Sequence, residues 1–285
     1  MPTQRHAEAR DQRLRARFGG THAVVTGGSA GIGLAVARRL LRCGATVTLV
    51  ARDPGRLEQA AAGLGSPPGV HTLALDVADQ EAVAAELPRE LAQRPADLLV
   101  NCAGIAHAGR FVETDPEVFR RVTDVDYLGT VWMTHAAVPY LEGRPQAHIA
   151  NVASMAALEG VYGYAAYAPA KFAVLGFSQV LRAELRPRGI GVSVLLPPNT
   201  DTEQLSAELE QLPDEMRPIH ATSKVLAPDA VAESLLAGVC SGRFEIIPGR
   251  DNRVLDRVHR ISHRPLRTGF DLMVRRELQR RGRTR

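Results

Sequence analysis

A tyrosine and a lysine stand four residues apart in the segment YAPAK, at Tyr167 and Lys171. In a helix this spacing places both side chains on one face, with their Cβ atoms about 5–6 Å apart. An ammonium group so close favours the phenolate and lowers a tyrosine pKa that is ordinarily about 10. The pair could then donate a proton near neutral pH, although an isolated Y-x-x-x-K is also typical of an ordinary surface pair.

Seven apolar runs rich in β-branched residues alternate with helical patterns and must position this pair. The runs cover residues 21–26, 45–51, 70–76, 96–101, 146–154, 190–197 and 243–248. The segments between them, such as 31–44 and 116–141, are long enough for crossover helices. The alternation predicts an α/β fold: a single doubly wound domain of the Rossmann type, with a seven-stranded parallel sheet flanked by helices.

The first run leads directly into a glycine-rich turn, TGGSAGIG at residues 26–33, and then into a helical pattern. Gly27, Gly31 and Gly33 would let the backbone turn tightly and approach a pyrophosphate at the helix N-terminus, where free N–H groups favour anions. Such a turn alone is weak support for a nucleotide site. Its place after the first strand of an α/β pattern strengthens the prediction.

The end of the second run bears on the choice of cofactor. An acidic residue there would accept hydrogen bonds from the ribose hydroxyls of NAD, but the run ends in Ala51 and Arg52. Because an arginine can pair with a 2′-phosphate, the sequence favours NADPH. Asp53, next along the chain, keeps NADH as the alternative, and Arg52 could also be an ordinary surface residue.

The chain resembles the short-chain dehydrogenase/reductase family over about residues 20–250, in motifs that follow the order of the family: TGGSAGIG, Asn101-Cys102-Ala103-Gly104, Ser154 and Tyr167-x-x-x-Lys171. The resemblance implies that Tyr167 donates a proton to a ketone oxygen as hydride arrives from the nicotinamide. It also implies that Lys171 holds the nicotinamide ribose and depresses the tyrosine pKa, and that Ser154 orients the carbonyl.

The resemblance further implies a set of cofactor contacts. The set is Gly27, Ser29, Gly31, Ile32, Gly33, Arg52, Asp76, Val77, Asn101, Ala103, Gly104, Tyr167, Lys171, Pro197, Thr200 and Thr202. Asp76, which closes the third run, matches the family's adenine-contacting aspartate, and it could equally be a helix N-cap.

Two residues depart from the pattern of the family. Pro169 lies between Tyr167 and Lys171, and because an interior proline costs a helix about 3 kcal/mol, this stretch is predicted to be a first turn. Asp126, the other candidate catalytic residue, stands where the family usually has an asparagine that completes the proton relay. If that role is mainly that of a backbone carbonyl holding a water, aspartate serves; if the side-chain amide matters, the relay is impaired. We expect activity to be retained.

The segment after the sixth run, at about residues 200–225, corresponds to the mobile substrate flap of the family. This segment carries an apolar stripe formed by Leu205, Leu209, Leu212, Met216 and Ile219. Pro213 and Pro218 break it into short helices. The stripe either belongs to the core or contacts an apolar substrate.

The segments TLVAR, DYLGTV and PPNTDT resemble the 3-ketodihydrosphingosine reductase branch of the family. This implies NADPH-dependent reduction of a lipophilic ketone such as a long-chain 3-keto sphingoid base. The alternatives are a reductase of another lipophilic ketone, such as a 3-oxoacyl, steroid or polyketide intermediate, and a non-catalytic NADPH-binding regulator.

Positive charge is concentrated at the two ends of the chain. Residues 1–17 carry five arginines against two acids and residues 250–285 carry twelve against four, so that of a total charge of +4 the middle, 18–249, holds −7. We therefore predict a reductase domain at 18–249 between a basic N-terminal extension and a basic C-terminal tail.

The C-terminal tail either contacts an anionic membrane peripherally or stays solvated or packed on a sister subunit. Its apolar face for membrane contact would comprise Val254, Leu255, Val258 and Ile261. Only Phe270 supplies an aromatic ring among the charges, so we expect no nucleic-acid partner.

Three scattered cysteines without CxxC spacing fit a reducing compartment and predict neither a disulfide nor a structural metal site. The N-terminus has no apolar signal region, and no apolar run reaches the roughly 18 residues of a spanning helix. We expect a cytoplasmic homodimer or homotetramer, with peripheral contact at a membrane surface as the option that the tail leaves open.

Overall fold

All seven predicted runs form strands of one parallel sheet, in the order β3-β2-β1-β4-β5-β6-β7. The computed structural model describes residues 4–65, 68–217, 224–249, 251–253, 269, 272–277 and 279–280. The strands are β1 His22–Thr26, β2 Thr46–Ala51, β3 Val70–Ala74, β4 Leu98–Asn101, β5 His148–Val152, β6 Gly191–Leu195 and β7 Glu245–Ile246. The predicted doubly wound Rossmann architecture is confirmed.

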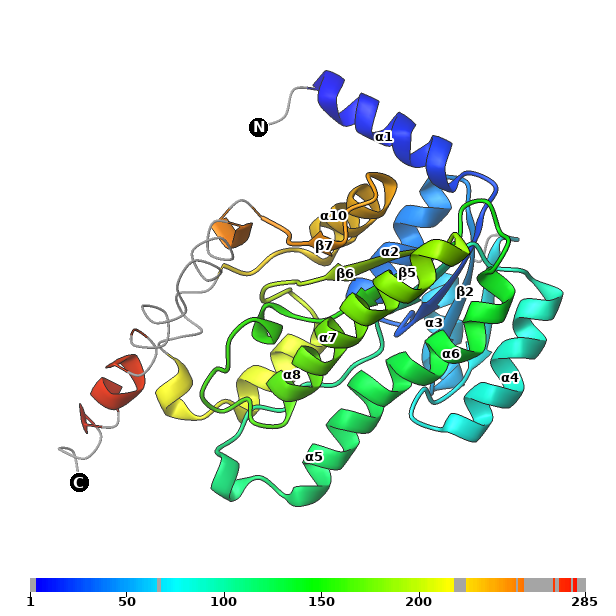
Figure 1. The fold of residues 1–285 in the computed structure, drawn as a ribbon. Helices are drawn as coiled ribbons and strands as arrows, with labels where there is room; N and C mark the ends of the chain where they lie inside the picture. The colour runs from blue at the N-terminus through cyan, green and yellow to red at the C-terminus, as the bar shows by residue number, and fades with distance from the viewer. Residues whose placement is uncertain are drawn as a thin grey trace.

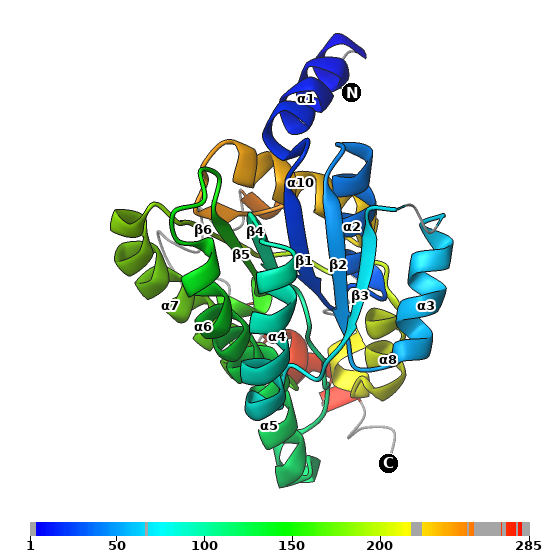
Figure 2. The same cartoon turned by 90° about the vertical axis from the view of Figure 1, so that its right-hand side faces the viewer.

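Helices cover both faces of the sheet (Figures 1 and 2). Those that share a core with one face are α2 Gly31–Arg42, α3 Pro54–Gly63 and α10 Pro228–Cys240. Those on the other face are α4 Gln80–Gln93, α6 Gly129–Leu141 and α7 Tyr167–Leu185. Because the sheet is covered on both sides, every residue of β1, β4 and β5 is buried, which explains why these strands do not alternate between apolar and charged residues.

The order of the strands reverses on either side of β1. Ala23 of β1 pairs with Val47 of β2 on one side and with Leu98 of β4 on the other. In open α/β sheets ligands bind at the carboxyl ends of the strands beside such a switch point. The glycine turn that follows β1 and the segment that follows β4 therefore meet at the position where a dinucleotide would lie.

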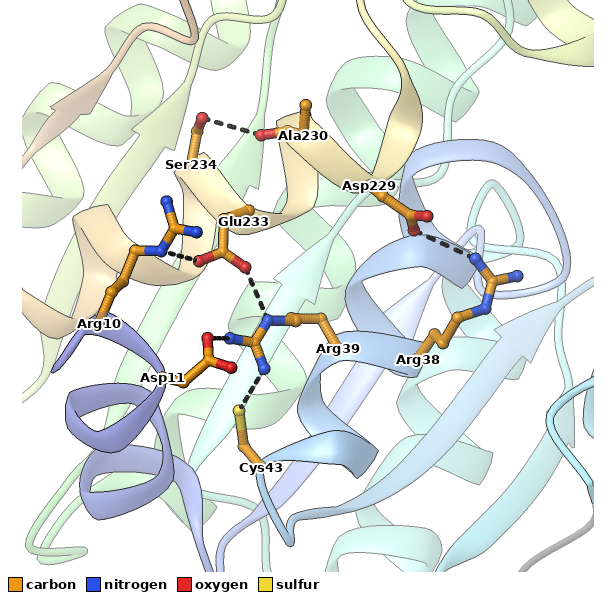
Figure 3. A network of polar contacts seen from close by, with 9 residues as sticks. All are labelled: Arg10, Asp11, Arg38, Arg39, Cys43, Asp229, Ala230, Glu233 and Ser234. Atoms are coloured by element: carbon orange, nitrogen blue, oxygen red, sulfur yellow. Dashed lines mark hydrogen bonds and ion pairs between the residues drawn. The ribbon is translucent and has the colours of Figure 1, made fainter. Parts of the chain in front are cut away.

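The predicted N-terminal extension forms a helix, α1 Gln4–Phe18, whose side chains enter the core of the domain. Leu14 and Phe18 are fully buried in the same cluster as α2 and α10. Figure 3 shows Arg39 of α2 at the centre of a polar network, where it pairs with Asp11 of α1 and, at 2.7 Å, with Glu233 of α10. Part of the charge in the extension thus anchors α1 to the domain.

The predicted membrane face of the C-terminal tail, Val254, Leu255, Val258 and Ile261, lies outside the described residues. Among the described residues of the tail, Val274 is buried whereas Leu272 and Met273 are exposed. Within the described ranges no helix is both long enough and apolar enough to cross a membrane.

Candidate active site

The glycine turn and the loop after β4 are in backbone contact, which explains two of the glycines. Gly27 has a φ of +63°, and a Cβ on it would lie 2.9 Å from the carbonyl oxygen of Cys102. A Cβ on Gly33 would lie only 2.3 Å from the carbonyl oxygen of Gly27. A side chain at Gly27 would push the two loops apart, and one at Gly33 would collide with the turn itself, so both positions require glycine.

The turn delivers the N-terminus of α2 to the switch point. Its N-cap residue, Ala30, makes no side-chain capping hydrogen bond. Apart from the N–H of Gly33, which hydrogen-bonds to Cys102, the first N–H groups of the helix are therefore left for an anion, which the helix dipole also favours. Gly31, with a φ of +52°, and the half-buried Ser29 and Ile32 surround this end of the helix. These residues fit the pyrophosphate of a dinucleotide.

Thr26, the last residue of β1 and the first of the TGGSAGIG segment, connects the two loops. Its hydroxyl accepts hydrogen bonds from the backbone N–H groups of Cys102 and Ala103, each at 2.9 Å. The position of Thr26 at the start of the TGGSAGIG motif was the sequence feature that could have indicated this role. Thr26 positions Ala103 and Gly104, both of them predicted cofactor contacts, at the switch point.

Asn101, a predicted cofactor contact, directs its side chain into the interior. Its amide nitrogen donates to Thr134 Oγ1 at 3.0 Å and to Asn151 Oδ1 at 2.9 Å. Asn151 in turn donates to Ser178 Oγ of α7 at 2.9 Å. The amide nitrogen of Asn101 therefore links β4 to α6 and β5, and through Asn151 to α7.

Arg52 and Asp53, which follow β2, differ in whether their side chains already have a structural role. Asp53 is the N-cap of α3, and its carboxylate accepts the backbone N–H of Arg56 at 3.1 Å. Arg52 is an exposed side chain one residue earlier, at the carboxyl edge of the sheet. Because Asp53 is occupied in capping, Arg52 is the better placed of the two for a cofactor phosphate.

Asp76 follows β3 and is not a helix N-cap, so that alternative is wrong. Its carboxylate accepts the backbone N–H of Ala78 at 3.0 Å, whereas the N-cap of α4 is Asp79. Val77 is buried, and a Cβ on Gly129 would lie 2.7 Å from its side chain. Both predicted residues therefore lie in a tight loop beside the strand ends.

The Tyr-Lys pair lies in the first turn of α7, as the presence of Pro169 predicted. Tyr167 is the first residue of this helix and Pro169 the third. The Tyr167 hydroxyl is hydrogen-bonded to the side chain of Ser154, which follows β5. Lys171 Nζ lies 5.6 Å from the centre of the Tyr167 ring. The structure thus brings the predicted serine, tyrosine and lysine together.

Asp126 completes this group through a direct ion pair. Its Oδ2 lies 3.1 Å from Lys171 Nζ, with the aspartate side chain fully buried and the lysine side chain 6% exposed. Its Oδ1 accepts the backbone N–H of Ile105 at 2.8 Å. Asp126 lies in a π-helical segment, Thr123–Leu128, which the sequence did not predict and which is a feature frequent at functional sites.

The surroundings of Tyr167 raise the pKa of its phenol, whereas the sequence predicted a lowered pKa. Burial raises the pKa of the phenol, Lys171 acts to lower it, and Asp126 acts to raise it, so that the pKa stays above its ordinary value. Burial would lower the pKa of Lys171, but Asp126 and Tyr167 raise it. The prediction that Lys171 lowers the pKa of Tyr167 is confirmed for the contribution of Lys171 alone. It is wrong for the overall shift of that pKa, which is upward. The tyrosine is held in the protonated form that a proton donor requires.

The predicted flap begins directly over the glycine turn. Pro197 is buried and its carbonyl accepts the N–H of Met155, while the hydroxyl of Thr200 donates to the carbonyl of Pro198. Thr202 caps α8 Glu203–Gln211, and a Cβ on Gly31 would lie 3.1 Å from its methyl group. The flap therefore crosses the N-terminus of α2.

The apolar stripe of the flap divides between core and surface. Leu212 and Met216 are buried against Tyr164 and pack beside Tyr167. Leu209 is exposed, and Ile219 lies outside the described residues. The inner part of the stripe thus lines the region next to the catalytic group.

A Rossmann sheet with a glycine turn at its switch point and a Ser-Tyr-Lys group beside it defines a nucleotide-dependent oxidoreductase. Residues 21–213 match the short chain dehydrogenase family. The chain is 35% identical over 246 residues to a 3-dehydrosphinganine reductase from Danio rerio, covering 84% of this chain and 74% of the relative. It is 33% identical to a 3-ketodihydrosphingosine reductase from Bos taurus, covering 83% and 73%.

A solved short chain dehydrogenase from Burkholderia cenocepacia, in complex with NADP, has a similar fold. It superimposes with a TM-score of 0.75 at 26% identity, covering 89% of this chain and 98% of that one. The chain belongs to the short-chain dehydrogenase/reductase family.

Proposed function

We propose that this enzyme uses NADPH to reduce a lipophilic ketone, specifically a long-chain 3-keto sphingoid base, to the secondary alcohol. The observation that carries the proposal is the Ser154, Tyr167 and Lys171 group, held beside the glycine turn and under an apolar flap. The relatives named for 3-dehydrosphinganine and 3-ketodihydrosphingosine reduction support this choice of substrate.

Each residue of the group has a separate role in ketone reduction. The cofactor, when bound, supplies the hydride. Tyr167 donates a proton to the carbonyl oxygen, and Ser154 hydrogen-bonds that oxygen and fixes its orientation. Lys171, held as an ammonium by Asp126, lies next to the phenol and is available to a ribose hydroxyl. Gly104 keeps Lys171 and Tyr167 accessible to the cofactor, because a Cβ on Gly104 would lie 3.2 Å from Lys171 Nζ.

The substrate class is tested by following NADPH oxidation with matched ketones. We expect turnover of a long-chain 2-amino-3-ketone well above that of a 3-oxoacyl thioester, a steroid ketone or a polyketide-like diketone. Preference for one of these others would replace the substrate and keep the reaction. Tight NADPH binding without turnover of any ketone would instead indicate the non-catalytic regulator.

Arg52 is proposed to select NADPH over NADH by pairing with the 2′-phosphate. Arg52→Ala should raise the KM for NADPH by about 10- to 100-fold, because a charge-assisted hydrogen bond is lost, and should change the KM for NADH by less than about threefold. Arg89→Ala, which removes an exposed arginine of α4, is the matched control. Equal changes for both cofactors would show that Arg52 does not bind the phosphate.

We also propose that the enzyme is a homo-oligomer that buries the outer face of α7. Phe172 and Val180 are 42% and 54% exposed on this helix, and Gly176 between them leaves the backbone open at the same helical spacing. Val180→Glu should shift the mass measured by light scattering toward the monomer. An unchanged mass, or a monomeric parent, would contradict the proposal.

Peripheral contact with an anionic membrane is proposed for the basic tail after Gly249. Outside the tail, Phe111 and Val112 offer an apolar surface for the same contact, because their side chains are 69% and 86% exposed. Basic residues near an anionic surface contribute about 1 kcal/mol each. Co-sedimentation with phosphatidylserine vesicles should be lost at high salt and on deletion of residues 250–285. Retention in both cases, or no binding by the intact chain, would contradict the proposal.

A further inference from the structure

The flap helix α8 carries a glutamate that is buried although its helical neighbours are exposed. Glu208 is only 9% exposed, whereas Glu203 and Glu210 of the same helix face solvent. Carboxylates are seldom buried to this degree unless they serve a polar partner or a ligand. The direction of the Glu208 side chain, toward the protein, therefore requires an explanation.

The Glu208 side chain reaches the catalytic group through Tyr164. The Tyr164 hydroxyl donates a hydrogen bond to Glu208 Oε1, and the rings of Tyr164 and Tyr167 have centroids 5.8 Å apart. Leu212 and Met216 of the flap pack around the same rings. The negative charge of Glu208 also raises the pKa of Tyr167, which places the carboxylate within electrostatic reach of the reacting phenol.

The second buried carboxylate of the flap has a different position and different partners. Glu215, in η5 Asp214–Met216, accepts hydrogen bonds from Arg110 Nε at 2.6 Å and from the Tyr162 hydroxyl at 2.9 Å. This ion pair fastens the flap to the segment after β4. Glu215 is therefore a matched control for a carboxylate that holds the flap but does not contact the Tyr164 and Tyr167 pair.

A 2-amino-3-ketone carries an ammonium group on the carbon next to its carbonyl. When the carbonyl oxygen lies at the Tyr167 hydroxyl, this ammonium must lie close to the apolar Leu212 and Met216 of the flap, where a positive charge is costly unless a carboxylate meets it. We propose that Glu208 binds the substrate ammonium and so selects ketones with an amine beside the carbonyl. This inference rests on the proposed function and adds to it the residue that recognises the amine.

The test compares Glu208→Gln with the parent on two ketones of equal chain length, the 2-amino-3-ketone and its N-acetyl derivative. Glutamine keeps the size of the side chain and an acceptor for Tyr164, so the fold should be preserved, as the unfolding temperature and NADPH binding will show. Loss of a charged partner should lower kcat/KM for the amino ketone by about 10- to 150-fold. The value for the N-acetyl ketone should change by less than about threefold.

Glu215→Gln is the control, and it should affect both ketones to the same degree because it only loosens the flap. An equal loss with both ketones in Glu208→Gln would make Glu208 a structural residue and overturn the inference while leaving the proposed function intact. A parent enzyme that reduces only ketones without an amine would remove the proposed function, and the role of Glu208 with it.

Discussion

Replacing Tyr167 with phenylalanine should lower kcat for ketone reduction by about a thousandfold or more, because the side chain that donates the proton loses its hydroxyl. The ring, its contact with Tyr164 and the position of Lys171 all remain, so the dissociation constant for NADPH should change by less than about threefold. Both quantities can be measured on the same preparation, by NADPH oxidation and by quenching of the single tryptophan, Trp132.

Tyr162→Phe is the matched control for this change. Tyr162 lies in the loop that precedes α7 and donates to Glu215 rather than to the reacting region. We expect its kcat to stay within about threefold of the parent. Turnover by Tyr167→Phe within tenfold of the parent would refute the assignment of the proton donor, and a loss of NADPH binding would show that the change disturbs the cofactor site as well.

The framework of this site could be predicted because each part of it depends on local rules. Strands that are buried on both faces are mainly apolar and carry no charged residues on a solvent face, and the glycines of the turn mark places where a Cβ cannot fit. The spacing of Tyr167 and Lys171 fixes their common face, and Pro169 fixes their place in the first turn of α7. Such constraints can be recognised from a few neighbouring residues.

The predictions that were wrong or incomplete depend on contacts between distant segments. The hydrogen bonds from Asn101 to Thr134 and Asn151 were not predicted, because only the packing of the sheet and its helices brings these residues near. Similarly, the net pKa of Tyr167 depends on burial and on Asp126, which is far away in the sequence. Buried carboxylates such as Glu208 are equally hidden, because in the sequence they look like the solvated acids beside them.

Asp126 is the departure from the family pattern whose consequences the structure now makes testable. Asp126→Ala removes the partner of a buried lysine and the acceptor of the Ile105 N–H. Leaving Lys171 as an uncompensated buried charge should lower the free energy of unfolding by about 3–5 kcal/mol, measured by urea denaturation. Asp126→Asn keeps an acceptor for Ile105 and supplies the residue usual in the family, so we expect kcat to stay within about tenfold of the parent.

The charge of Asp126 should nevertheless be visible in the pH dependence of Asp126→Asn. Reduction needs protonated Tyr167, so the rate falls as the pH rises through the pKa of that phenol. The Asp126 carboxylate raises the pKa of Tyr167, and its removal should therefore lower this pKa and move the alkaline limb of kcat to lower pH. Asp124→Asn, in the same π-helical segment, should leave the limb in place. A limb that stays fixed or moves to higher pH in Asp126→Asn would show that Asp126 does not act on the phenol by its charge.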